Sequence, residues 1–165
     1  GLCIQGFLVG AAAVSLGGLF VLGLPVGVVL DATAPGLFFG IGIGRLGCFF
    51  TGCCAGRESA SRWAIWSSDR RVGARRLPTQ LLESLAAFGI GVAALLAHIF
   101  ARPGVPGVIL VASFAAYTLC RQGLLRLRGE ARRSSLGGPV TAMMAAIVLL
   151  ASLSSVFLGT TRAWL

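Results

Sequence analysis

The sequence contains no lysine, one histidine, one tyrosine and only five acidic residues among its 165 positions. Charged residues make up 12% of the chain, against about 25% in soluble globular domains. Hydrophobic residues make up 56%, and the stretches 3–30 and 84–101 hold almost no charge. A soluble fold of this length has too little interior to bury so much apolar surface. The composition therefore excludes an ordinary soluble domain and predicts a protein whose solvent is lipid.

Five apolar stretches approach the length of about 20 residues that a membrane-spanning helix needs. We expect them at about residues 2–22, 25–50, 80–101, 105–119 or a little beyond, and 139–159. Glycines recur in them, as in GLFFGIGIG, and small residues allow close helix packing in membranes. The predicted fold class is an all-α, polytopic transmembrane bundle of about five spans with one long polar loop, forming a single domain over residues 1–165. No signal peptide is recognisable at the start, and because the chain opens at Gly1 without Met, we expect further sequence upstream.

Positive charge is concentrated in two polar segments. The net charge of +9 comes entirely from arginine, and most arginines lie in residues 51–79 and 121–138, which five spans would place on one side of the membrane. Trp63 and Trp66, in the first segment, suit the membrane–water interface. Beside spanning helices, basic clusters favour anionic lipid headgroups as partners, and we expect no nucleic acid. The positive-inside rule would make this side cytoplasmic.

Two charged residues, Asp31 and Arg45, interrupt the second apolar stretch. A charge at the centre of a span costs at least about 2.5 kcal/mol on insertion scales, so each residue is expected to have a partner. Along a straight helix they would lie about 21 Å apart, too far to pair with each other. The alternatives are structural ion pairs and a functional site, and a structural pair explains Asp31 more easily than Arg45.

The five cysteines form an odd number, which excludes a complete disulfide framework. Cys3 and Cys120 lie in apolar runs and are expected to be small buried hydrophobic residues. Cys48, Cys53 and Cys54 form a cluster with two interpretations. Their thiols could have depressed pKa values and take part in exchange or acyl transfer, or they could form a structural disulfide, either vicinal or between Cys48 and Cys53. The spacing does not fit usual zinc sites, and no metal or other cofactor is expected.

From Gly44 the chain reads GRLGCFFTGCCAGR, and from Arg76 it reads RLPTQLLES. These strings, in this order between membrane stretches, resemble the signature of prolipoprotein diacylglyceryl transferases, approximately G-R-[IL]-G-N-F-x-N-x-E-x-x-G-R followed by H-P-S-Q-L-Y-E. IQGFLVG is similar to the family's H-G-G-x-x-G segment, RQGLLRLRGE to its R-x-x-x-E-x-x-R-G stretch, and Asp31 to an aspartate before the signature helix. The chain therefore resembles a divergent, N-terminally shortened member of that family.

The resemblance implies a multi-pass transferase of the bacterial cytoplasmic (inner) membrane that acts in lipoprotein biosynthesis. Such an enzyme moves a diacylglyceryl group from a phosphatidylglycerol-like phospholipid to the cysteine thiol of a lipobox-containing preprotein. The family's site faces the extracytoplasmic side. We follow this orientation and not the one that the positive-inside rule gives. Arginines that bind an anionic substrate are counted by that rule although they do not report on orientation.

Arginine suits the binding of a lipid phosphate, because its guanidinium forms paired hydrogen bonds with phosphate oxygens and stays protonated at neutral pH. We expect Arg45 and Arg128 to be the catalytic phosphate clamp, with Arg121 in support. For Arg128 the alternative is a basic loop solvated by headgroups. Gln80 and Glu83, one helical turn apart, are expected to orient Arg45 or the lipid glycerol. The remaining substrate-binding positions implied by the resemblance are Gln5, Gly47, Cys48, Thr51, Cys53, Gly56 and Arg57.

The chain departs from the family pattern at positions that carry acid–base groups. Gln5 stands where the family has a histidine thought to be the base, and an amide cannot take up a proton at neutral pH. His98, near the far end of the third stretch, is expected to be structural. Two other functions therefore stay open, a thiol-dependent membrane redox protein and a non-catalytic lipid-binding subunit. The other replaced positions are Cys48, Thr51, Cys53, Leu77, Leu82 and Leu125.

Overall fold

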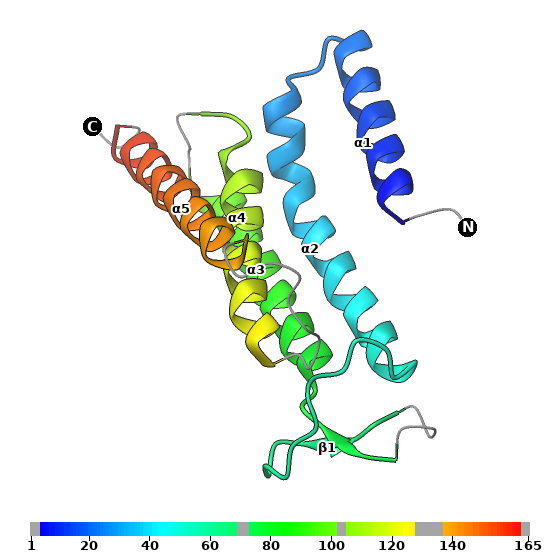
Figure 1. Cartoon of the computed structure of the whole chain (residues 1–165). Coiled ribbons are helices and arrows are strands. Elements are labelled where there is room, and N and C mark those ends of the chain that lie inside the picture. Colours follow the sequence, from blue (N-terminus) through cyan, green and yellow to red (C-terminus); the bar gives the residue numbers. More distant parts are fainter. Residues whose placement is uncertain (1–3, 69–72, 102–104, 128–136, 163–165) are drawn as a thin grey trace.

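The computed structural model describes residues 4–68, 73–101, 105–127 and 137–162. Within these ranges the chain forms five α-helices, of which α4 continues into a short 3-10 helix, η1 (Leu125–Leu127). Helices α2 to α5 lie side by side in a bundle, and α1 lies beside α2 (Figure 1). The structure thus agrees with the prediction of an all-α helical bundle. The α-helices are α1 (Ile4–Val21), α2 (Val26–Phe50), α3 (Thr79–Phe100), α4 (Val108–Leu124) and α5 (Gly137–Arg162).

Four stretches of the described residues are helical, long and apolar enough to span a membrane. They are Val26–Phe50, Thr79–Phe100, Val108–Leu127 and Gly138–Leu158. Helix α1 has 18 residues and corresponds to the first of the five stretches expected from the sequence. The fourth helix begins three residues later than expected and extends beyond 119, because its polar last turn continues the helix. The described part of the chain is therefore a helical bundle with four candidate membrane spans.

Helices α2 and α3 form the most extensive helix–helix contact of the bundle, and glycines make it possible. A Cβ atom on Gly91 would lie 2.8 Å from the Phe39 ring, and one on Gly42 would lie 3.0 Å from the Phe88 ring. The Ser84 hydroxyl donates a hydrogen bond of 2.9 Å to the carbonyl oxygen of Gly42. The close packing expected from the glycine-rich sequence is confirmed at these two positions.

Asp31 lies inside α2 and caps the N-terminus of α4. Its side chain is buried, and its carboxylate accepts hydrogen bonds from the backbone N–H groups of Gly107, at 2.8 Å, and Leu110, at 3.1 Å. The first turn of a helix presents unpaired N–H groups and the positive end of the helix dipole, so a carboxylate is stabilised there. The partner of Asp31 is therefore a helix end, and the prediction that it does not pair with Arg45 is confirmed.

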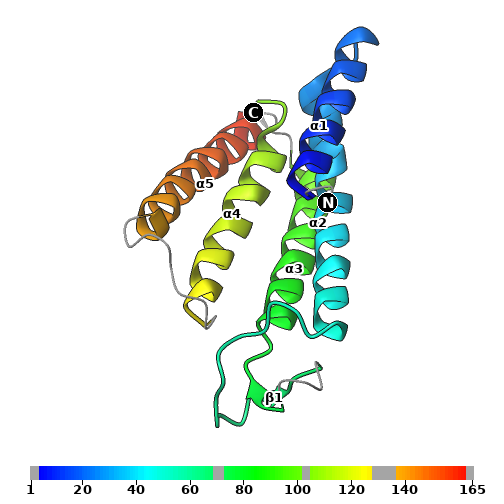
Figure 2. The ribbon, with the colours of Figure 1, turned by 45° about the vertical axis from the view of Figure 1, so that its right-hand side comes forward.

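The segment between α2 and α3 contains a small antiparallel hairpin that the sequence analysis did not predict. Its strands are β1 (Ile65–Trp66) and β2 (Arg75–Arg76), with Ile65 opposite Arg76. Figures 1 and 2 show the hairpin beyond the ends of α2 and α3. The backbone N–H of Arg57 donates to the carbonyl oxygen of Leu127 at 2.9 Å, which joins this segment to the end of η1. The first basic segment and the start of the second therefore meet at one end of the bundle.

Candidate functional site

Arg45 and Glu83 form a buried ion pair between α2 and α3. The Nε atom of Arg45 lies 2.7 Å from Oε2 of Glu83, and the two side chains are only 16% and 1% exposed. Arg45 lies near the end of α2 and Glu83 near the start of α3, so the pair lies at the end of the bundle that carries the hairpin. A buried charge needs a partner of opposite sign. Each of these two buried side chains therefore has the other as its partner of opposite charge.

Tyr117, the only tyrosine of the chain, approaches Arg45 from α4. It is buried and interacts with the Arg45 guanidinium. Its ring packs against Phe38, with ring centroids 5.8 Å apart, in a core cluster that also contains Ala87. The sequence analysis did not single out Tyr117. The signal that could have found it is a lone phenol inside a predicted span, because a buried hydroxyl needs a polar neighbour.

The turn that follows α2 is held by the first residues of α3. The Gln80 side-chain amide donates a hydrogen bond of 2.7 Å to the carbonyl oxygen of Cys53. The Thr79 hydroxyl donates one of 3.2 Å to the carbonyl oxygen of Cys54. Gln80 and Glu83 therefore have different partners, since Glu83 holds the Arg45 side chain whereas Gln80 holds the cysteine turn.

Cys48, Cys53 and Cys54 lie at the end of α2 and in the turn that follows it. The Cys48 thiol interacts with both Arg45 and Cys53, and the Cys53 thiol also interacts with Cys54. The chain reverses sharply here, with φ of 73° at Gly52 and 60° at Cys54. The structure thus brings the cysteine cluster next to Arg45, and among the described residues neither disulfide considered from the sequence is present. Cys120, expected to be buried, is exposed.

The Cys53 thiol has an environment that favours its anion. A contact with the Thr51 hydroxyl, supported by the Cys48 and Cys54 thiols and by the charge of Arg45, lowers the pKa of Cys53 below the ordinary value for a thiol. The Cys53 residue is exposed. Reagents and substrates can therefore reach its thiolate.

Gly47 and Gly56 differ in their surroundings. A Cβ atom on Gly56 would lie 2.7 Å from the carbonyl oxygen of Leu77, so the fold requires a glycine there. A Cβ atom on Gly47 would meet nothing within 4 Å. Packing therefore explains the glycine at position 56 but not the one at position 47.

The remaining candidates come from the turn after α2 and from the end of α4. The Thr51 hydroxyl donates to the carbonyl oxygens of Gly47 and Cys48, at 3.1 Å each, and so closes the last turn of α2. Arg57 is exposed, and its backbone contacts η1 as described above. Arg121 is half-buried in the last turn of α4, four residues after Tyr117, and therefore lies on the same face of that helix.

Three further positions contribute no described contact to the ion pair. Two of them have side chains outside the described residues, and the third lies far from the pair. Gln5 belongs to the first turn of α1, but its side chain lies outside the described residues. Arg128, the expected second half of the phosphate clamp, also lies outside them. His98 is exposed in the last turn of α3, about 22 Å along the helix from Glu83. His98 therefore belongs to the opposite end of the bundle, as expected.

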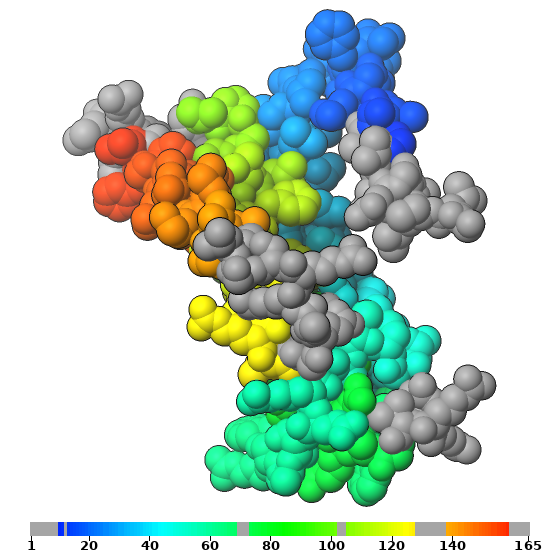
Figure 3. All heavy atoms as spheres, in the orientation of Figure 1, coloured from blue at the N-terminus to red at the C-terminus, as the bar shows by residue number. Residues whose placement is uncertain are grey.

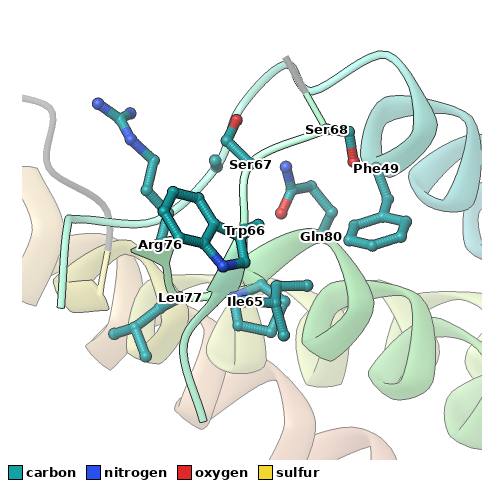
Figure 4. Close-up of a pocket in the computed structure, with 10 residues that line it drawn as sticks. Phe49, Ile65, Trp66, Ser67, Ser68, Arg76, Leu77 and Gln80 are labelled. Atoms are coloured by element: carbon teal, nitrogen blue, oxygen red, sulfur yellow. The ribbon is translucent and has the colours of Figure 1, made fainter. Parts of the chain in front are cut away.

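The hollows near these residues differ in size and lining. A notch where the hairpin meets α2 and α3 lies beside Phe49, Trp66 and Gln80 (Figure 4) and has room for about one water molecule, 10 Å³. A larger apolar groove of about 170 Å³ runs between α3, α4 and α5. It is lined mainly by alanine and branched aliphatic side chains, among them Ile90, Ala94, Ala112, Leu149 and Leu153.

One residue connects the apolar groove with the core cluster that contains Tyr117. Ile90, one of its lining residues, also packs against the core cluster of Phe38, Ala87 and Tyr117. Tyr117 in turn interacts with Arg45. In the described part of the chain, no group of three or more histidine, cysteine or acidic side chains is arranged to hold a metal ion. The arrangement can thus hold an anion at Arg45 and apolar chains in the groove.

Comparison with known proteins gives matches to one family. The family model for prolipoprotein diacylglyceryl transferase matches residues 1–163. A phosphatidylglycerol–prolipoprotein diacylglyceryl transferase of Streptomyces avermitilis is 40% identical over 72 residues, which are 42% of this chain and 21% of that protein. The second such enzyme of Clostridium perfringens is 38% identical over 64 residues, 37% of this chain and 25% of that protein.

A third relative, from Dehalococcoides mccartyi, carries the same name as the Streptomyces protein. It is 36% identical over 62 residues, 35% of this chain and 24% of that protein. The chain therefore aligns with a quarter or less of the length of each of these curated relatives. No solved structure matches the chain.

Proposed function

Because this chain belongs to the prolipoprotein diacylglyceryl transferase family, we propose that it transfers a diacylglyceryl group from phosphatidylglycerol to the cysteine thiol of a preprotein. In this reaction the thiolate sulfur attacks the glyceryl carbon that carries the phosphate. A carbon–sulfur bond forms, the carbon–oxygen bond to the phosphate breaks, and glycerol phosphate leaves with the bonding electrons. The names of the relatives supply the two substrates.

The observation that carries this proposal is the placement of Arg45. A guanidinium within a spanning helix is held by Glu83 through its Nε atom and approached by Tyr117. With Nε fixed in this way, the terminal nitrogens of the guanidinium are the part suited to bind two phosphate oxygens. The positive charge stabilises the phosphate as negative charge develops on the leaving oxygen. Arg45 therefore binds the headgroup and assists its departure.

The same geometry supports a place for the lipid tails. The apolar groove between α3, α4 and α5 ends near Tyr117, so a phosphate on Arg45 would leave acyl chains at the mouth of that groove. Arg121, on the Tyr117 face of α4, is proposed as the second cation near the phosphate. Arg128 remains our proposal for the other half of the clamp, on the basis of its match to the family's arginine.

The thiol that attacks must lose its proton, and Gln5 cannot accept it. We propose that the Cys53 thiolate takes this proton. Cys53 is exposed, it lies in a turn fixed by Gln80, and its pKa is lowered toward neutral pH. Proton transfer between two thiols is close to balanced in energy, because both have pKa values in the same range. Cys53 thereby serves as the base in place of an imidazole.

A transfer assay with the full-length protein in phosphatidylglycerol vesicles tests the proposal. Radiolabelled phosphatidylglycerol is the donor and a lipobox peptide is the acceptor. We expect Arg45→Ala to lower the transfer rate by roughly 100-fold, as for the loss of one preorganised donor in other enzymes. Arg126→Ala, which removes an exposed arginine from η1, is the matched control and should retain activity. Wild-type turnover by Arg45→Ala would refute the phosphate-binding role.

A thiol-dependent redox function is the second candidate, and the direct interaction of Cys48 with Cys53 favours it. In that case, replacing Cys48, Cys53 and Cys54 together by serine would abolish activity toward a disulfide substrate, while Arg45→Ala would leave it intact. The transferase proposal instead predicts that Arg45→Ala lowers diacylglyceryl transfer, and that the triple serine variant lowers it as well, because Cys53 is the proposed base. Tight binding of phosphatidylglycerol without any transfer would instead identify a non-catalytic lipid-binding subunit.

A further inference from the structure

Two tryptophan side chains on the segment between α2 and α3 are largely exposed. Trp63 is 69% and Trp66 68% exposed. Figure 3 shows the atoms of this segment gathered at the base of the molecule, past the ends of the helices. Large aromatic side chains are rarely left so exposed without a partner, because each contributes a large apolar area. The surface formed by Arg62, Trp63 and Trp66 is here called the Trp–Arg surface.

The backbone that carries the Trp–Arg surface is well fixed. Ala64, between the two tryptophans, is 1% exposed, and its carbonyl oxygen accepts a hydrogen bond of 3.0 Å from Nε of Arg75. Trp66 lies in β1, opposite Arg75 in β2. Trp66 therefore projects from a held strand and Trp63 from the turn just before it, so little conformational entropy is lost when they contact a partner.

The charge around the two tryptophans is positive. The Arg62 guanidinium lies 5.2 Å from the centre of the Trp63 ring, in a cation–π contact. Arg57 is exposed as well. Glu58, the one acidic side chain among the described residues of this segment, forms an ion pair of 3.0 Å with Arg76. The partner that complements this surface is thus anionic and has an apolar layer that can receive indole rings.

The position of the segment identifies that partner. Helix α2 ends at Phe50, and α3 begins at Thr79, so the chain leaves the membrane and returns to it on the same side. The hairpin lies directly beyond these two helix ends (Figures 1 and 2). Phe50, at the last position of α2, is 75% exposed. Tryptophan is favoured at the membrane–water boundary, and arginine near it binds phosphate headgroups.

We propose that the Trp–Arg surface docks into the headgroup layer and binds anionic phospholipid there, separately from the phosphate site at Arg45. The indole rings of Trp63 and Trp66 lie at the level of the glycerol backbone, and Arg62 contacts lipid phosphate. This docking fixes the hairpin against the membrane and keeps the mouth of the Arg45 site close to anionic lipid. It requires no catalytic activity, so its test is independent of the transferase assay.

Depth-dependent fluorescence quenching tests the proposal. The full-length protein with Trp66→Phe and Trp164→Phe retains Trp63 as its only tryptophan. It is reconstituted in vesicles of phosphatidylcholine alone or mixed with phosphatidylglycerol, with bromine atoms at a shallow or a deep position of the acyl chains. We expect Trp63 to be quenched by shallow bromines far more than by deep ones. Adding phosphatidylglycerol should increase the quenching, and high salt should remove that increase.

Two variants supply the controls. In the single-tryptophan protein, Arg62→Gln should lower the ratio of docked to undocked hairpin roughly fivefold in the mixed vesicles, the expected effect of one cation near an anionic membrane. Arg126→Gln removes an exposed arginine outside the surface and should leave the ratio unchanged. A separate protein lacks the three native tryptophans and carries Leu150→Trp, at an exposed position in the middle of α5. Its single tryptophan should be quenched best by deep bromines.

The outcomes separate the possible partners. Quenching of Trp63 by an aqueous quencher such as acrylamide, but by bromine at neither depth, would overturn the proposal and indicate that the surface faces water, where a protein partner could bind it. Shallow quenching that is equal in both lipid mixtures and unchanged by Arg62→Gln would overturn the binding of anionic lipid. Shallow, phosphatidylglycerol-dependent and Arg62-dependent quenching supports it.

Discussion

Nε of Arg45 lies 2.7 Å from Oε2 of Glu83, in a contact that joins α2 to α3 within the membrane bundle. The carboxylate is 1% exposed, so water cannot replace the guanidinium as its partner. This pair fixes the height and direction of the one arginine that the spanning part of α2 contains. Stability measurements on the pair therefore report on the integrity of the site without any assay of activity.

We predict that breaking the pair destabilises the protein more than removing it. Arg45→Met leaves an uncompensated buried carboxylate and should cost about 3–5 kcal/mol in free energy of unfolding. The double variant Arg45→Met with Glu83→Leu should lose much less, because no charge remains buried. Thermal or denaturant unfolding in detergent micelles measures both values. Additive losses from the two single changes would contradict this coupling.

The cap on α4 makes a second prediction. Asp31→Ala removes two hydrogen bonds from backbone N–H groups to a buried carboxylate, and we expect a loss of about 2–3 kcal/mol. Hydrogen exchange of the Gly107 and Leu110 amides should speed up. Thr33→Ala, in the same helix, removes an exposed hydroxyl that bonds only within its own turn, and should change neither quantity. Unchanged amide protection in Asp31→Ala would show that the cap is not maintained in the membrane.

Alanine substitutions at two glycines should act in opposite directions. Gly56→Ala places a Cβ atom 2.7 Å from a carbonyl oxygen and should destabilise the protein by about 1–3 kcal/mol through overpacking. Gly47→Ala enters open space within α2 and should stabilise the helix by about 0.5–1 kcal/mol. Unfolding curves compare the two variants. A loss of stability in Gly47→Ala equal to that in Gly56→Ala would contradict this difference.

The reactivity of Cys53 should depend on pH in a defined direction. Because the pKa of Cys53 is lowered, its thiolate forms, and its alkylation by iodoacetamide accelerates, at a lower pH than for a cysteine in an unstructured peptide. Thr51→Val removes the first cause of this shift and should move the midpoint upward, whereas Thr51→Ser keeps the hydroxyl and should not. Site-resolved mass spectrometry across a pH series gives the midpoints. Equal midpoints for Thr51→Val and the unmodified protein would exclude the Thr51 contact as the cause.

The sequence predicted the helices well because membrane spans carry a simple signal. A run of about 20 apolar residues bounded by polar segments leaves little choice of structure, and α2 and α3 begin and end within one residue of the expected positions. The hairpin was not predicted because two-residue strands have no periodic pattern. Its pairing, with Trp66 opposite Arg75, depends on contacts that local sequence does not encode.

The contacts within the site were only partly predictable. Glu83 was expected to orient Arg45, and the ion pair places it where it can do so. Gln80, expected to act in the same way, instead holds the carbonyl oxygen of Cys53. One helical turn separates these two side chains, and which neighbour each reaches depends on the turn after α2. Tyr117 escaped notice because its approach to Arg45 depends on how α4 packs against α2.

The two charged residues of α2 also determine which part of the bundle can open. Asp31 fastens α2 to the N-terminus of α4, and Arg45 fastens it to α3 about 21 Å farther along the helix. A helix secured at two depths can neither slide nor rotate without breaking a charged contact. Helix α5, by contrast, contacts the bundle chiefly through α4, along an apolar hollow lined by Val111, Phe114 and Met144. Moving α5 away from α4 would therefore break neither of these two charged contacts, whereas moving α2 would break both.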